Sequence, residues 1–190
     1  FNTGLLSFLA SSPTPFHCVA IMAQRFVEAG FSRLDEAASW QLKPGGKYFL
    51  TRNGSSIIAF IYGEQDMLAQ GVRMVGAHTD SPCLMVKPNP EQRKHGFLRL
   101  SVEVYGGALL NPWFDRDLSI AGRIVFQSAD GALGQRLVDF AEPVAVIPNL
   151  AIHLDRQAND SRTVNPQTEI SPILFLQGEG RETDFRQCLA

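Results

Sequence analysis

The sequence lacks several features that mark special classes of protein. Its 190 residues contain only three cysteines, an odd number and far apart, which argues against a disulfide framework and fits a reducing cytoplasm. No apolar run approaches the roughly 20 residues of a transmembrane helix. The net charge is −2 and no block of like charge occurs, so nothing indicates a nucleic-acid or membrane-surface footprint.

The familiar catalytic motifs are absent as well. There is no Gly-x-Ser-x-Gly elbow, P-loop, dinucleotide fingerprint, Cys-x-x-Cys pair or His-Glu-x-x-His helix. The composition, 45% hydrophobic and 19% charged, is that of an ordinary globular protein. The length suits one domain, or one domain and part of another. Because the sequence begins at Phe1 and shows no stop signal of a finished domain, we expect it to belong to a longer chain.

Two helices are predicted near the start. Leu5–Ala10 is apolar, but it is short and no basic region precedes it, so an amphipathic helix is favoured over a signal peptide. Residues 15–29 have apolar side chains at three- and four-residue spacing, which is typical of one helix face. Thr14 suits the N-cap, Pro15 the first helical position and Gly30 the end.

A β-hairpin follows these helices. Asn53-Gly54 is the strongest short hairpin signal, and it lies between predicted strands at 46–51 and 56–62. Because the second strand is continuously apolar, we expect it to be buried on both faces. The first 85 or so residues therefore predict the start of a helix-flanked sheet.

The most informative stretch runs from residue 72 to residue 82. Val72–Ala77 is short, apolar and rich in small or β-branched residues, so it predicts a buried strand that ends just before His78. In extended backbone His78 and Asp80 share a face. A neutral imidazole is the commonest metal ligand, and a nearby carboxylate can accept its other N–H. Chance spacing of two common polar residues is the alternative interpretation.

After Pro82 the pattern changes to closely spaced short strands, which indicate a β-rich module. A strand is predicted at 83–87, and the proline-bearing polar segment 88–94 reads as a linker, where we place the domain boundary. Within 98–105 the residues Leu98 to Val104 alternate on one face. Further strands are expected at 118–127, 134–140 and 143–147, with a turn at 128–131.

Three places in or near this module leave alternatives open. Residues 111–117 (Asn-Pro-Trp-Phe-Asp-Arg-Asp) suit a structural turn with a local Arg–Asp pair, or a substrate or metal contact next to exposed aromatics. His153, in an apolar segment, suits a packed core residue or a ligand. Cys83 suits a buried structural thiol better than a nucleophile paired with His78. Residues 159–162 are expected to be a loop.

Four motifs, taken together and in this order, resemble the aspartyl aminopeptidase family of dinuclear metallopeptidases. The resemblance covers essentially the whole chain and corresponds to the amino-terminal half of such an enzyme. It rests on Ser12-Pro13-Thr14-Pro15-Phe16-His17, Gly76-Ala77-His78-Thr79-Asp80-Ser81-Pro82-Cys83-Leu84, Trp113-Phe114-Asp115-Arg116-Asp117-Leu118 with Ala121-Gly122-Arg123, and Ile147-Pro148-Asn149-Leu150-Ala151-Ile152-His153-Leu154.

This resemblance implies an α/β fold, with a helix-flanked mixed sheet and an inserted β-rich oligomerisation domain. Residues 1–88 would form the first part of the peptidase domain, and residues 89–190 an incomplete inserted domain. Family members are cytoplasmic enzymes that remove amino-terminal Asp or Glu from peptides. They use two divalent metal ions, most commonly Zn²⁺, with Co²⁺ or Mn²⁺ active in some members. Their subunits dimerise through the inserted domain and build a tetrahedral homo-dodecamer.

Carried over by position, the resemblance implies roles for three residues. His78 matches a metal ligand, Asp80 matches the carboxylate that supports it in catalysis, and His153 matches a histidine that reaches into the neighbouring subunit's active site. The family's Glu-Glu pair, its bridging Asp and its final ligands have no counterpart in this sequence. Because zinc takes three or four protein ligands, we expect these residues alone to be inactive. The alternatives are a non-catalytic oligomerisation or interaction module, and a mononuclear metal or cysteine-dependent hydrolase.

Overall fold

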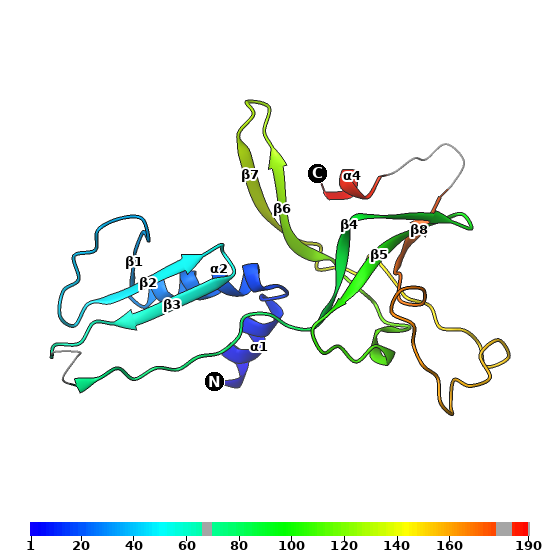
Figure 1. Cartoon of the computed structure of the whole chain (residues 1–190), viewed down its shortest axis with the longest axis horizontal. Coiled ribbons are helices and arrows are strands. Elements are labelled where there is room, and N and C mark those ends of the chain that lie inside the picture. Colours follow the sequence, from blue (N-terminus) through cyan, green and yellow to red (C-terminus); the bar gives the residue numbers. More distant parts are fainter. Residues whose placement is uncertain (66–69, 178–183, 190) are drawn as a thin grey trace. The chain divides into compact units, whose positions relative to one another are not determined.

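The computed structural model describes residues 1–65, 70–177 and 184–189 (Figure 1). The chain has a mixed α/β structure that divides into two compact units. One unit comprises Phe1–Ser81 with Gln127–Leu137, and the other comprises Pro82–Phe126 with Val138–Ala190. None of the helices in the described ranges is long and apolar enough to cross a membrane.

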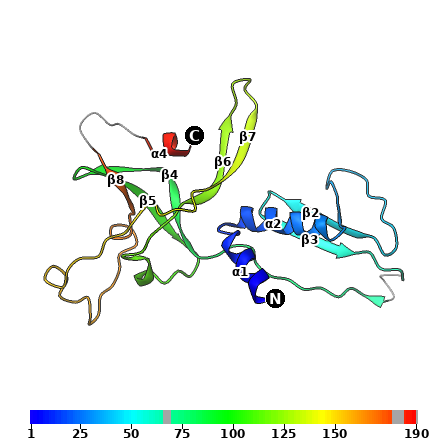
Figure 2. The same ribbon diagram turned by 180° about the vertical axis from the view of Figure 1, so that it is seen from behind.

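The first unit combines two helices with a small mixed sheet, as expected. Strand β1 pairs parallel with β2, and β2 pairs antiparallel with β3. Helix α2 packs on β2 and β3 (Figure 2). In this packing Phe26 lies over Phe49, with ring centroids 5.9 Å apart. The elements are α1 (Asn2–Ala10), α2 (Pro15–Glu28), β1 (Ser32–Arg33), β2 (Lys47–Arg52) and β3 (Ser56–Ile61).

The predicted boundaries of α2 are confirmed by its caps. The hydroxyl oxygen of Thr14 accepts a hydrogen bond from the backbone N–H of His17, and Pro15 is the first helical residue. At the other end Gly30 has a φ of 81°, which lets the N–H of Phe31 bond to the carbonyl of Phe26 at 2.8 Å. This is a Schellman ending, in which glycine adopts the left-handed conformation without a Cβ clash.

The predicted hairpin is also confirmed, but the predicted burial of its second strand is not. Asn53 and Gly54 both have positive φ, 52° and 63°, as the central residues of a type I′ turn do, and the N–H of Ser55 bonds to the carbonyl of Arg52 at 3.1 Å. Strand β3 was expected to be buried on both faces, and this is wrong. Ile58 and Ile61 are both exposed, and because they are three residues apart in one strand they point to opposite faces of the sheet, so neither face of β3 is fully covered.

The expected buried strand over Val72–Ala77 is not formed. The segment has no regular secondary structure, and its apolar side chains face solvent, with Val75 99% exposed. A strand must exchange its backbone hydrogen bonds with a neighbouring strand. No strand among the described residues pairs with this segment, so apolar character alone does not produce a strand here.

The second unit is built mainly on a three-stranded antiparallel sheet with the order β4-β5-β8. The predicted alternation on β5 is confirmed, since Leu98, Leu100 and Val102 are all buried. Strands β6 and β7 form a separate two-stranded sheet whose turn lies at residues 128–131, as predicted; β6 begins in the second unit, but Gln127–Leu137, with the turn and most of β7, belongs to the first unit. The elements are β4 (Cys83–Lys94), β5 (Phe97–Tyr105), the 3₁₀-helix η1 (Asn111–Trp113), β6 (Ala121–Gln127), β7 (Leu133–Asp139), β8 (Ile173–Leu176) and α4 (Phe185–Leu189).

The prediction of a linker at residues 88–94 is wrong, because strand β4 continues through these residues. Strand β4 lies at the edge of its sheet, and its register with β5 shifts between Val86 and Glu91. Pro88 and Pro90 fall in that shift, and an edge strand or a bulge is where proline is tolerated in a sheet. Within this chain the compact units separate after Ser81. The assignment of residues 1–88 and 89–190 to a peptidase domain and an inserted domain stays a prediction about the whole protein.

Candidate functional site

His78 and Asp80 contact each other, although the backbone around them is not a strand. The Nδ1 atom of His78 lies 2.7 Å from the backbone oxygen of Asp80 and 3.3 Å from its Oδ1. A carbonyl oxygen can only accept, so Nδ1 carries the proton, and in the neutral imidazole Nε2 then has the free lone pair. The His78 side chain is 82% exposed. An imidazole that is oriented through one nitrogen and accessible at the other has the arrangement of a metal ligand.

Thr79 anchors this pair to the hairpin of the first unit. Its hydroxyl donates to the carbonyl oxygen of Ser55 at 2.8 Å. Ser55 directly follows the Asn53-Gly54 turn, whose geometry is set by local sequence. The position of His78 therefore depends on a rigid turn, which the sequence predicts, and on a side-chain hydrogen bond across 24 residues, which it does not.

His78 does not form a metal site by itself. In residues 1–65, 70–177 and 184–189, no three His, Cys, Asp or Glu side chains come together as a metal-binding group. A zinc site takes three or four protein ligands. The chemistry of His78 and its supporting oxygen fits one of these ligands, so a zinc site here would need further ligands from outside the described residues.

His153 lies in the second unit, and the interpretation of it as a core residue is wrong. It is exposed, as are the flanking Ile152 and Leu154. The backbone N–H groups of Leu154 and Asp155 bond to the carbonyl of Ala151, at 2.8 and 3.1 Å, and so close a turn around the histidine. We call residues 147–155 the His153 loop. It presents an imidazole between apolar side chains on the surface of its unit.

The motif at 111–117 forms a structural turn, but not with the expected local Arg–Asp pair. Its first residues are the 3₁₀-helix η1, and Phe114 is buried instead of exposed. Asp115 bonds to the His153 loop: its backbone N–H donates to Ile147, and its Oδ1 accepts from the N–H of Asn149, both at 2.9 Å. Asp115 therefore joins two motifs that are 34 residues apart.

Arg162 is the residue near this site that sequence reasoning missed. It lies in the predicted loop 159–162, yet its side chain is only 16% exposed. Its Nε lies 3.3 Å from Oδ2 of Asp155, and its Nη1 donates to the side-chain oxygen of Asn149. Its guanidinium carbon is 4.5 Å from the centroid of the Phe114 ring. Since these partners come from separate parts of the chain, no periodic pattern in the sequence indicates the contacts.

The cysteines give no support to a thiol mechanism. Cys18, Cys83 and Cys188 are free, as expected from their number and spacing. Cys83 is half-buried on β4, and this burial raises the pKa of its thiol. A raised pKa keeps the thiol protonated near neutral pH, whereas a nucleophilic cysteine needs the thiolate. The structure therefore agrees with the interpretation of Cys83 as a structural thiol.

The chain is similar to known peptidases over nearly its whole length. Residues 8–187 match the family described as "Aminopeptidase I zinc metalloprotease (M18)". A probable M18 family aminopeptidase 2 from Pseudomonas putida (strain GB-1) is 58% identical over 188 residues. The match covers 99% of this chain and 44% of the relative, so the chain spans less than half the length of that relative.

Solved structures show the same fold. The structure of Ape4 in complex with Nbr1 matches with a TM-score of 0.90 and 42% identity, covering 96% of this chain and 35% of that one. A structure of mApe1 from S. cerevisiae, described as a dodecamer, matches with a TM-score of 0.72 and 27% identity, covering 97% and 50%. Both likenesses cover the two compact units of this chain almost completely.

Proposed function

The chain belongs to the M18 family of zinc metalloproteases, and from this premise we propose that the whole protein is an aminopeptidase that removes amino-terminal Asp or Glu from peptides. The observation that carries the proposal is the state of His78. In a chain that is 58% identical to an M18 aminopeptidase, this imidazole is accessible and is oriented through Nδ1. The acidic preference rests on the resemblance of the four motifs to aspartyl aminopeptidases.

Within this proposal His78 is a ligand of one of two divalent ions, most commonly zinc. Bound metal supplies Lewis-acid polarisation of the scissile carbonyl and a lower pKa for the attacking water. The backbone oxygen of Asp80 accepts a hydrogen bond from the Nδ1–H group of His78, and the Asp80 carboxylate lies nearby. This orientation of the ring keeps Nε2 available to the metal. Thr79 holds both residues against the Ser55 carbonyl.

His153 would act in the active site of a neighbouring subunit. Its exposure between apolar side chains supports a residue that is presented to another chain. There it would donate a hydrogen bond to the oxyanion that develops on the scissile carbonyl. We propose a homo-dodecamer built from dimers, in line with the similar mApe1 structure described as a dodecamer. A cytoplasmic location belongs to the same proposal and is supported by the three free cysteines.

The test uses the full-length protein and short peptides that differ only in their first residue. We expect release of amino-terminal Asp and Glu to exceed release of Ala, to stop with a chelator and to return with zinc. His78→Asn should lower both bound zinc and kcat/KM by more than about 100-fold, since it removes a ligand. Asp80→Asn keeps the backbone acceptor and removes only the carboxylate 3.3 Å from Nδ1, so it should cost less than His78→Asn, about 10-fold.

His95 is the matched control histidine. It is exposed in the turn between β4 and β5 with a φ of 55°, a conformation that asparagine accepts. His95→Asn should leave zinc content and activity within about twofold of wild type, in the range of ordinary surface substitutions. Release that persists in chelator, or a His78→Asn variant that keeps its zinc, would contradict the proposal. Metal-independent assembly without any release would instead indicate an oligomerisation module.

A further inference from the structure

The His153 loop has little regular structure of its own to fix its shape. Its internal backbone hydrogen bonds are the two that close the turn at Ala151. Leu150, Ile152 and Leu154 are exposed, so side-chain packing does not hold the histidine end in place. A histidine that must meet a substrate needs a defined position, because small misplacements are costly in catalysis. The contacts that hold this loop must therefore come from outside it.

The beginning of the loop is held by Asp115. Ile147 is buried, its carbonyl accepts from the Asp115 N–H, and Phe114 forms a β-bridge with it. The Asp115 carboxylate then accepts from the N–H of Asn149. Asp115 has a φ of 54°, a left-handed conformation in which Asp is enriched among non-glycine residues. These contacts fix the backbone as far as Asn149.

Arg162 holds both sides of the histidine at once. Asn149 lies four residues before His153 and Asp155 lies two residues after it, and the guanidinium contacts both. The group is planar with donors in a fixed fork, so it sets the separation of its two partners as well as contacting each of them. Its stacking on the buried ring of Phe114 fixes its plane against the core.

From these contacts we infer that Arg162 is a positioning residue, which acts on the reaction by holding His153 in its productive place. The inference rests on the proposed function for its catalytic consequence, and on the structure alone for its physical content. Arg162 itself touches no reacting atom in this account. Its loss should leave substrate binding largely intact and impair the step that His153 assists.

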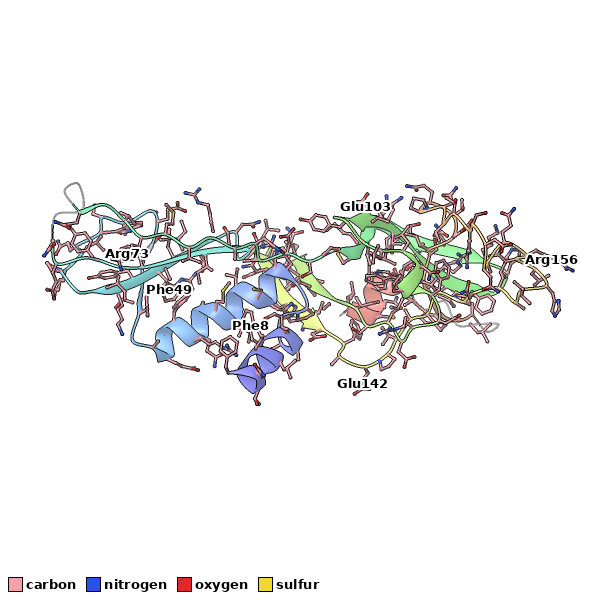
Figure 3. The ribbon with its side chains drawn as sticks, turned by 90° about the horizontal axis from the view of Figure 1, so that it is seen from below. Phe8, Phe49, Arg73, Glu103, Glu142 and Arg156 are labelled. Carbon is pink, nitrogen blue, oxygen red and sulfur yellow. The ribbon has the colours of Figure 1, made fainter. Side chains whose placement is uncertain are left out.

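The kinetic test uses the full-length enzyme. Arg162→Gln should lower kcat by about 10- to 100-fold, the cost of displacing a catalytic group, with a much smaller change in KM. Arg162→Lys should not restore kcat, because an ammonium group cannot contact both partners and stack on Phe114. Arg156→Gln is the matched control: Arg156 is exposed just after the loop and should be silent when substituted (Figure 3).

A double-mutant cycle separates positioning from a general structural role. If Arg162 acts through His153, Arg162→Gln should have almost no further effect on kcat in a His153→Gln background, because residues that act as a unit are not additive. Effects of the two substitutions that multiply independently would overturn the inference. So would full activity in Arg162→Lys, which would show that charge alone is sufficient.

Amide hydrogen exchange on the same proteins gives a readout that needs no peptidase activity. Residues 149–155 should exchange several-fold faster in Arg162→Gln than in wild type, with exchange elsewhere and the oligomeric state unchanged. Arg156→Gln should match wild type. Unchanged exchange at 149–155 would overturn the inference even in an active enzyme. If wild type releases no amino acid while exchange responds as expected, the proposed function fails and the holding of the loop by Arg162 stands.

Discussion

Replacing Ile147 by alanine tests the packing on which the His153 loop rests. Ile147 is 1% exposed and belongs to the core cluster of the second unit. The substitution removes the side-chain carbons beyond Cβ, which costs about 2.4 kcal/mol at roughly 0.8 kcal/mol per buried carbon group. The cavity that remains raises the loss of unfolding free energy to about 3–4 kcal/mol, within the usual range for such changes. The other buried members of the cluster are Leu100, Val102, Phe114, Ile170 and Phe185.

Urea unfolding of the 190-residue chain, followed by fluorescence, measures this loss. Trp113 packs against the same cluster and reports on it, and a Trp40→Phe background makes it the only tryptophan of the chain. Ile152→Ala is the matched control, the same substitution in the same loop at a side chain that is 45% exposed. It should change stability by less than about 0.5 kcal/mol. Equal losses in the two variants would refute the placement of Ile147 in the core.

Two further predictions concern the N-cap of helix α2 and the reactivity of the three cysteines. Thr14→Ala should destabilise the first unit by about 1 kcal/mol, because the N–H of His17 loses its acceptor, and Thr14→Ser should recover most of this. Urea unfolding followed by circular dichroism measures the loss, since the two longest described helices, α1 and α2, lie in the first unit. A Thr14→Ala variant as stable as wild type would show that the cap contributes nothing. Burial raises the pKa of the Cys18 and Cys83 thiols, so a smaller fraction of each is thiolate at a given pH. At about pH 8 iodoacetamide should therefore modify the exposed Cys188 first. The rate of modification at Cys18 and Cys83 should increase as the pH rises. Mass spectrometry of the alkylated peptides measures the order, and prior modification of Cys83 would revive a thiol mechanism.

The features predicted correctly from sequence are those whose causes are local. Helix α2 begins after a threonine cap and ends at Gly30, which adopts a positive φ without help from distant residues. The Asn53-Gly54 turn forms because both residues accept positive φ. The predicted alternation along β5 is correct because side chains of consecutive residues in a strand point to opposite faces, so every second residue lies on the buried face. The His78–Asp80 contact likewise spans only two residues and forms without the strand that suggested it, although the hydrogen bond is to the backbone oxygen of Asp80 and the expected carboxylate lies farther away, at 3.3 Å.

The sequence by itself therefore determined the family, the hairpin, helix α2, the β-rich character of the second unit and the local pairing of His78 with Asp80. Only the tertiary structure decided which segments became strands: the polar residues 91–94 did, because β5 pairs with them, and the apolar segment Val72–Ala77 did not, because no described strand pairs with it. It also decided that Arg162 meets Asn149, Asp155 and Phe114 around the His153 loop. Propensities and caps act between neighbours along the chain, whereas backbone pairing and side-chain contacts of this kind depend on which distant segments the fold brings together.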